Sequence, residues 1–179
     1  QHIYLVEDAL EALQDLARFY RIHLRIPVIG LTGSNGKTTT KELISAVLKE
    51  KFKTHYTFGN LNNHIGVPLT ILSIPEGTEI AVIEMGANHQ KEIELFASNA
   101  QPDYGYITNF GKAHLEGFGG FEGVIKGKSE LYDFLRNNNR TAFVNFNDPI
   151  QVEKTNNINR ITFSDQHNAT IQVDLIKQK

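Results

Sequence analysis

The chain has 179 residues, of which 40% are hydrophobic, and its 18 Lys and Arg against 20 Asp and Glu give a formal net charge of −2. This balance excludes a general polyanion binder, which needs a basic excess, and the absence of cysteine excludes disulfides, thiolate metal sites and a cysteine nucleophile. No apolar run approaches the roughly 18 residues of a membrane span, and acidic residues among positions 1–17 do not fit a signal peptide. We therefore expect a soluble, cytoplasmic, single domain that binds neither nucleic acid nor membrane, and we also expect it to be a monomer.

Apolar spacing predicts helices and strands that alternate along the chain. Residues 9–20 place apolar side chains on one helical face, and the apolar run 27–32 is typical of a buried strand. The period-two pattern in 161–179 leads us to expect an antiparallel edge. The alternation as a whole predicts an α/β fold, a doubly wound and mostly parallel sheet flanked by helices. Further helices are expected around 43–48, 67–72, 91–98 and 121–136, and further strands in 53–57, 80–83, 104–108 and 141–144.

A glycine-rich loop, residues 32–39, lies between the first predicted strand and the next helix and reads Thr-Gly-Ser-Asn-Gly-Lys-Thr-Thr. In such a loop backbone N–H groups surround a phosphate, a lysine reaches the β- and γ-phosphates, and a threonine hydroxyl binds Mg²⁺. Leu31 stands where the standard pattern has its first glycine, so the loop is a shortened variant. The alternative is a glycine-rich turn with a chance lysine. The predicted phosphate-binding residues are Gly33, Ser34, Asn35, Gly36, Lys37, Thr38 and Thr39.

Polar side chains follow other predicted strands at the same edge of the sheet. Glu84 ends a buried strand, where a carboxylate can hold Mg²⁺ near the phosphates, although a lone strand-end Glu is more often a solvated or capping group. His114 and the run 62–64, Asn-Asn-His, follow other strands. Lys126 and Lys128 lie in a predicted helix, where lysines are usually solvated. From the residues alone, these are candidates only.

Four motifs occur in order between roughly residues 5 and 148. The first extends the glycine-rich loop to 32–42, and the second, 59–70, reads Gly-Asn-Leu-Asn-Asn-His-Ile-Gly-Val-Pro-Leu-Thr. The third, 84–89, reads Glu-Met-Gly-Ala-Asn-His, and the fourth, 113–119, reads Ala-His-Leu-Glu-Gly-Phe-Gly. Together they resemble the ATP-binding central domain of the Mur ligase family. The second and third motifs most resemble the family branch that adds a dipeptide.

The resemblance implies an ATP-dependent amide ligase of peptidoglycan precursor synthesis. In that reaction ATP phosphorylates the terminal carboxylate of a UDP-muramoyl-tripeptide, and the amine of D-alanyl-D-alanine attacks the acyl phosphate, giving the amide, ADP and phosphate. Cations must offset the repulsion between the carboxylate and the γ-phosphate. The resemblance therefore implies ATP and two Mg²⁺ ions as cofactors, with Lys37 as a catalytic cation and Thr38 and Glu84 as ligands of the first ion.

The resemblance also implies a second metal site and a substrate loop. His114 would be a catalytic ligand of the second ion, beside a carbamylated lysine that matches Lys128. Lys126 is the alternative, because Ser129 stands where the family usually has glycine after the modified lysine. Asn62, Asn63 and His64 match a family loop near the muramoyl-peptide substrate.

Other functions stay open. They are a sister ligase that adds a single amino acid, a folylpolyglutamate-type ligase, a P-loop nucleotide switch, and a nucleotide-binding remnant without catalysis. The resemblance implies that residues 1–24 form a linker helix from an N-terminal UDP-binding domain. Residues 25–179 would be a truncated central domain, without its adenine-contacting segment and without the C-terminal domain, so we expect little ligase activity from this chain alone.

Overall fold

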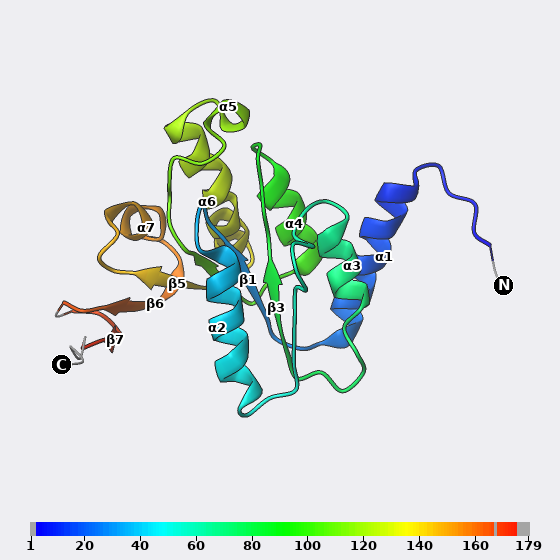
Figure 1. Ribbon diagram of the computed structural model, residues 1–179, viewed down its shortest axis with the longest axis horizontal. Coiled ribbons are helices and arrows are strands. Elements are labelled where there is room, and N and C mark those ends of the chain that lie inside the picture. The colour runs from blue at the N-terminus through cyan, green and yellow to red at the C-terminus, as the bar shows by residue number, and fades with distance from the viewer. Residues whose placement is uncertain (1–2, 167, 175–179) are drawn as a thin grey trace.

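The computed structural model describes residues 3–166 and 168–174, in which seven strands form one parallel sheet with the order β2-β3-β1-β4-β5-β6-β7 (Figure 1). The strands are β1 (Val28–Thr32), β2 (Thr54–Tyr56), β3 (Ile80–Glu84), β4 (Tyr104–Ile107), β5 (Thr141–Asn145), β6 (Asn159–Ser164) and β7 (Ile171–Gln172). The helices are α1 (Ala9–Leu24), α2 (Lys37–Lys49), α3 (Gly66–Leu72), α4 (Glu92–Ala100), α5 (Leu115–Phe118), α6 (Phe121–Asn137) and α7 (Pro149–Lys154). The predicted fold class is confirmed.

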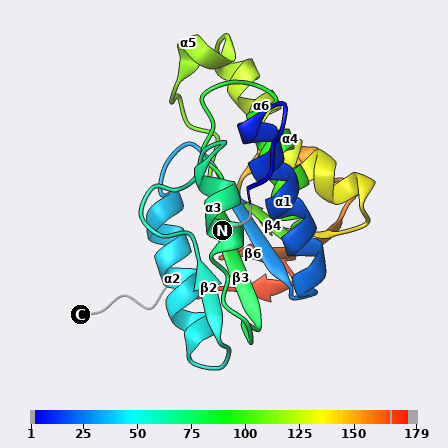
Figure 2. The same cartoon turned by 90° about the vertical axis from the view of Figure 1, so that its right-hand side faces the viewer.

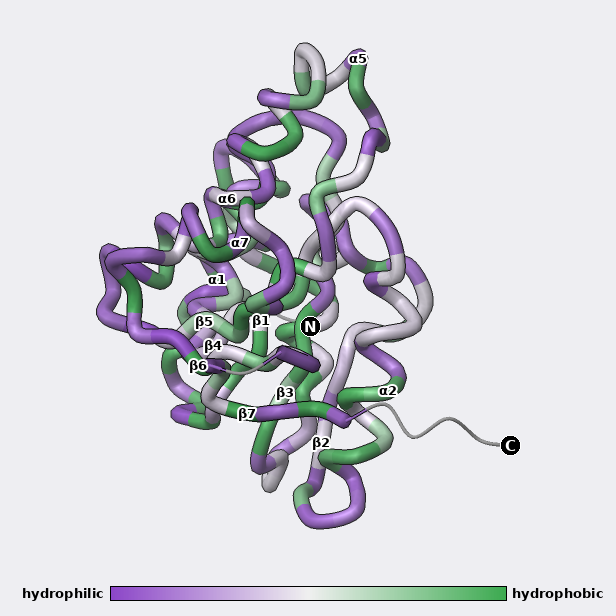
Figure 3. Tube along the Cα trace, turned by 90° about the vertical axis from the view of Figure 1, so that its left-hand side faces the viewer, coloured by the Kyte–Doolittle hydropathy of each residue, from purple (hydrophilic) through white to green (hydrophobic). Residues whose placement is uncertain are grey.

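The central strands explain why the sheet is parallel and covered on both faces. Every residue of β1 and of β3 is buried, and Figure 3 shows hydrophobic colour along these strands. Continuous apolar strands of this kind belong to sheets covered by helices on both sides. Strand β1 lies between β3 and β4. The crossover through α2 leads from β1 toward the β2 edge, whereas the crossover through α4 leads from β3 past β1 to β4 on its other side. Ligands of doubly wound sheets bind beyond the carboxyl end of such a strand.

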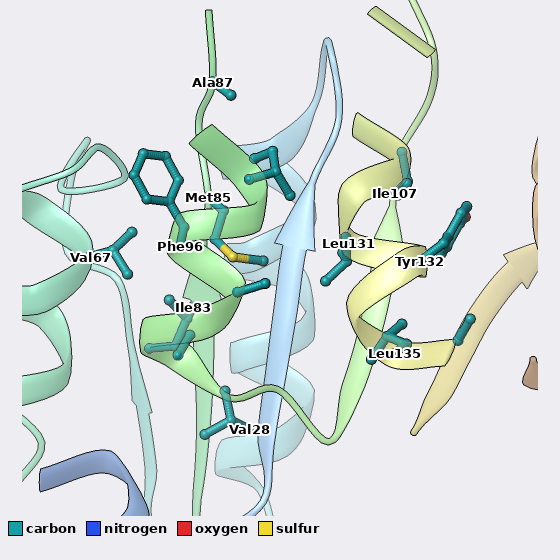
Figure 4. Packing of buried hydrophobic residues seen from close by; sticks show 14 of the residues in the cluster. Val28, Val67, Ile83, Met85, Ala87, Phe96, Ile107, Leu131, Tyr132 and Leu135 are labelled. Atoms are coloured by element: carbon teal, nitrogen blue, oxygen red, sulfur yellow. The ribbon is translucent and has the colours of Figure 1, made fainter. Parts of the chain in front are cut away.

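The helices form two layers around the sheet. Helix α2 contacts β1, β2 and β3, whereas α1, α3, α4 and α6 pack against one another on the opposite face (Figure 2). The larger hydrophobic core lies on that second face of the sheet (Figure 4). There Phe96 of α4 and Leu131 and Tyr132 of α6 belong to the same buried cluster as Ile83 of β3. The central strands are therefore held rigidly between the two layers.

Helix α1 is fastened to this core by polar contacts as well as apolar ones. The Arg21 guanidinium is buried and donates to the carbonyl of Ala100 at 2.8 Å and to the Asp103 carboxylate at 2.9 Å. The Tyr20 hydroxyl donates to the carbonyl of Ile74 at 2.9 Å.

Among the described residues, no helix is both long and apolar enough to cross a membrane.

The C-terminal edge differs from the expected antiparallel arrangement. Strand β6 pairs with β5 in parallel, and β7 pairs with β6 in parallel, with Phe163 opposite Ile171. Alternation of period two reports which face of a strand is exposed and carries no information on the direction of its neighbour, which is why the sequence pattern misled. The part of this prediction that falls on residues 167 and 175–179 lies outside the described residues. The short helices α5 and α7 were not expected.

Candidate nucleotide and metal site

The glycine-rich loop joins the carboxyl end of β1 to the first turn of α2, as expected. Gly33 has φ +142°, and a Cβ built on it would lie 2.0 Å from the Thr108 hydroxyl oxygen. Gly36 is the residue before α2 and has a left-handed φ of 74°. Gly33 therefore requires glycine for both space and conformation, whereas the left-handed conformation of Gly36 favours glycine. The result is a bare backbone loop at a helix N-terminus, where anions bind.

The segment after β4 holds this loop in shape. The backbone N–H of Ser34 donates to the carbonyl of Asn109 at 3.1 Å, and that of Asn35 donates to the Asn109 side-chain oxygen at 3.1 Å. The Thr108 hydroxyl donates to the carbonyl of Asn35 at 2.7 Å. Thr108 and Asn109 were not singled out from the sequence, although their place directly after a strand of the same sheet edge was a usable signal.

Lys37 lies at the mouth of the loop. Its ammonium donates to the carbonyls of Gly33 at 2.9 Å and Ser34 at 3.3 Å. Burial lowers the pKa of Lys37, and the nearby Glu84 carboxylate partly opposes that shift. The Lys37 side chain thus folds back over the backbone of the glycine-rich loop. This places its ammonium beside the region where the sequence predicts the phosphates to bind.

Glu84 lies at the end of β3 and is 1% exposed. The Asn62 amide donates to its Oε1 at 2.8 Å, and the Thr38 hydroxyl lies 3.4 Å from the same oxygen. Its Oε2 is buried and has no hydrogen-bond partner within the described chain, while the Lys41 ammonium lies 4.0 Å away. A buried carboxylate with an unbonded oxygen is costly unless a cation approaches it. The donor set of a hydroxyl and a carboxylate beside a phosphate loop fits Mg²⁺.

Lys41 belongs to this site and was missed from the sequence. Its side chain is fully buried, and its ammonium donates to the carbonyl of Thr57 at 2.7 Å. The Thr57 hydroxyl in turn accepts from the backbone N–H of Glu84 at 2.9 Å. Lys41 and Ser45 are the two buried residues of α2. They are four positions apart and so share one face of the helix, which is a spacing that can be read from the sequence.

The two candidate lysines of α6, Lys126 and Lys128, differ in their exposure to solvent. Lys128 is 1% exposed, donates to the carbonyl of Ala87 at 2.9 Å and lies 5.0 Å from the centre of the Phe118 ring. Burial, reinforced by the positive charge of Lys37, lowers the pKa of Lys128 to about 8. Lys126 is exposed. Lys128 therefore combines a partly neutral amine with proximity to the 84–89 motif.

The other predicted residues are His114, Asn63 and His64. His114 is exposed, precedes α5 with a left-handed φ of 55° and makes no side-chain hydrogen bond within the described residues. The Asn63 side chain accepts from the backbone N–H groups of Ile65 and Gly66, where α3 begins. Across residues 3–166 and 168–174, no group of three or more His, Asp and Glu side chains is placed to hold a metal ion.

Comparison with known proteins agrees with this geometry. The family model described as the Mur ligase middle domain matches residues 31–179. The UDP-N-acetylmuramoyl-tripeptide–D-alanyl-D-alanine ligase of Bacillus subtilis is 51% identical over 134 residues, which are 75% of this chain and 29% of the relative. The Escherichia coli enzyme of the same name is 45% identical over 75% of this chain and 30% of its own length.

Solved structures give the same result. MurF ligase from Thermotoga maritima in complex with ADP superposes with a TM-score of 0.84 at 37% identity, covering 92% of this chain and 38% of that one. MurF from Acinetobacter baumannii superposes with a TM-score of 0.83 at 38% identity, over 89% of this chain and 36% of that one. The chain thus spans less than a third of the curated relatives just named, at 29% and 30%. It belongs to the Mur ligase family, as a middle domain.

Proposed function

We propose that this chain is the nucleotide-binding domain of a UDP-N-acetylmuramoyl-tripeptide–D-alanyl-D-alanine ligase. The whole protein would join D-alanyl-D-alanine to a UDP-muramoyl-tripeptide, with ATP converted to ADP and phosphate. The observation that most supports this proposal is the glycine-rich loop, in which the Thr38 hydroxyl lies 3.4 Å from the buried Glu84 carboxylate. The 51% identity to the Bacillus subtilis ligase and the likeness to an ADP-bound relative support the choice of nucleotide and reaction.

The loop would bind the triphosphate through its backbone N–H groups and the N-terminus of α2. Lys37 would turn from the carbonyls of Gly33 and Ser34 to the phosphates, where its charge offsets that of the transferring group. Thr38 and Glu84 would hold Mg²⁺, which supplies charge stabilisation at the phosphates when bound. The phosphate-contacting set is Gly33, Ser34, Asn35, Gly36, Lys37, Thr38 and Thr39.

A second Mg²⁺ ion would lie nearer the substrate carboxylate, held by His114 and a carbamylated Lys128. The lowered pKa of Lys128 supports this choice over Lys126, because only a neutral amine reacts with CO₂ to form a carbamate. His114 directly precedes α5, whose Phe118 ring centre lies 5.0 Å from the Lys128 ammonium. Asn63 and His64 stay proposed neighbours of the muramoyl-peptide.

The chain would be one part of a larger, cytoplasmic and monomeric enzyme. Residues 1–24 would link it to an N-terminal UDP-binding domain, and residues 25–179 would form most of the central domain. The adenine-contacting segment and the amine-binding domain would follow it. The short coverage of the relatives, about 29% and 30% of their lengths, supports this division.

The test compares acceptors in the full-length protein. ADP release should require a UDP-muramoyl-tripeptide and should be stimulated by D-alanyl-D-alanine, with dipeptide ligation detected by mass. Turnover with a single amino acid but not with the dipeptide would instead indicate a sister ligase. Acceptor-independent hydrolysis would indicate a nucleotide switch.

A further inference from the structure

The loop before α3 closes over the end of β3 through one side chain, Asn62. We propose that Asn62 is a positioning residue that orients the Glu84 carboxylate for the metal of the bound nucleotide. This rests on the proposed function, because it concerns the same carboxylate, and it assigns Asn62 to the metal side of the site rather than to the muramoyl-peptide.

The first observation is the contact itself. The Asn62 amide nitrogen donates to Glu84 Oε1 at 2.8 Å, which is a short bond to an ionised acceptor. Apart from the 3.4 Å approach of the Thr38 hydroxyl, it is the one hydrogen bond that reaches the Glu84 carboxylate within the described chain. Asn62 therefore fixes the orientation of the carboxylate before any cation arrives.

The second observation is that the backbone beside Glu84 leaves room for this amide. A Cβ built on Gly86 would lie 2.9 Å from the Cγ, Nδ2 and Oδ1 atoms of Asn62. Gly86 does not have a left-handed φ, so its conformation alone does not require glycine. Its backbone N–H also donates to the carbonyl of Asn62 at 2.7 Å. Gly86 thus holds the Asn62 backbone and makes space for its side chain.

The chemistry suits a group that supports a metal ligand. A neutral amide donates a hydrogen bond without adding positive charge that would compete with Mg²⁺. It leaves Oε2 of Glu84 without a hydrogen bond. Partners of this kind set the orientation of ligating carboxylates, and losing one typically lowers metal affinity by about 10- to 100-fold.

The experiment measures ATP affinity of the full-length protein by calorimetry, with Mg²⁺ and with EDTA. Asn62→Ala should reduce the gain in ATP affinity that Mg²⁺ provides by about 10- to 100-fold, while the affinity in EDTA changes by less than about twofold. Asn60→Ala is the matched control, because Asn60 is an exposed asparagine of the same loop whose replacement should change neither value.

Gly86→Ala perturbs the same contact from the other side and should give the same phenotype with Asn62 still present. In the double variant, Gly86→Ala should add nothing to Asn62→Ala, because the clash and the hydrogen bond are both gone. Thermal unfolding of each variant establishes that the protein is folded before affinities are compared.

The outcomes separate this inference from the proposed function. Wild-type protein that binds ATP no better with Mg²⁺ than with EDTA would overturn both. A normal wild-type response with unchanged Asn62→Ala and Gly86→Ala proteins would overturn the Asn62 role alone. Equal losses with Mg²⁺ and with EDTA would show that Asn62 only shapes the loop, which also contradicts the inference.

Discussion

Replacing Lys41 by methionine tests the electrostatics of the buried site. Methionine keeps much of the volume of the lysine stem but removes the ammonium that lies 4.0 Å from Glu84 Oε2. At that distance, an effective dielectric constant of about 20 gives an attraction of about 4 kcal/mol. Since Glu84 is 1% exposed, water cannot replace the lost charge. We expect Lys41→Met to lower the free energy of unfolding by about 3–5 kcal/mol, which is the usual cost of removing one partner of a buried ion pair and leaving the other charge uncompensated.

The assay is urea unfolding of the variant and of two comparison proteins. Glu42→Gln removes the exposed partner that lies 3.0 Å from the Lys41 ammonium, and it should cost about 1 kcal/mol or less. In Lys41→Met/Glu84→Gln, the buried carboxylate charge is removed together with its partner. The double variant should therefore lose at least about 2 kcal/mol less than the sum of the two single variants.

Two results would refute this reasoning. A loss below about 1 kcal/mol for Lys41→Met would show that the ammonium does not stabilise Glu84. Simple additivity in the double variant would show that the two charges act independently despite their distance.

Three further predictions concern the phosphate loop and the proposed metal ligands. Gly33→Ala should cost about 1–3 kcal/mol of stability from backbone strain and should weaken nucleotide binding, because the new Cβ meets the Thr108 hydroxyl; unchanged calorimetric affinity would contradict the loop geometry. With ¹³C-labelled bicarbonate, a carbamate NMR signal should disappear in Lys128→Ala and persist in Lys126→Ala, and it should grow between pH 6 and 8 as Lys128, with a pKa of about 8, loses its proton; the reverse pattern between the two variants would assign the carbamate to Lys126. In the full-length enzyme, His114→Ala should lower kcat far more than it changes ATP affinity, whereas parallel losses would indicate a structural role.

The parts of the site that follow from strand order were predictable from the sequence. A glycine-rich loop after one buried strand and a carboxylate at the end of another must meet at the same edge of a parallel sheet, so Thr38 and Glu84 were placed together correctly. The spacing of the motifs also gave the family. These features depend on local patterns and on the one handedness that parallel crossovers adopt.

The contacts that depend on tertiary packing were not predictable in the same way. The bond from Asn62 to Glu84 joins a loop to a strand 22 residues later, and motif resemblance had assigned that loop to the substrate. Direction at the β6–β7 edge depends on the path of the connecting loop, which alternation does not encode.

The most direct test of the account is a crystal structure of the protein with Mn²⁺ and a non-hydrolysable ATP analogue. Mn²⁺ takes the oxygen ligands of Mg²⁺ and gives an anomalous signal. We predict an anomalous peak within roughly 2.2 Å of both the Thr38 hydroxyl and the Glu84 carboxylate, with the phosphates against residues 33–39. A nucleotide bound away from this loop, or a metal ion that contacts neither side chain, would contradict the central claim.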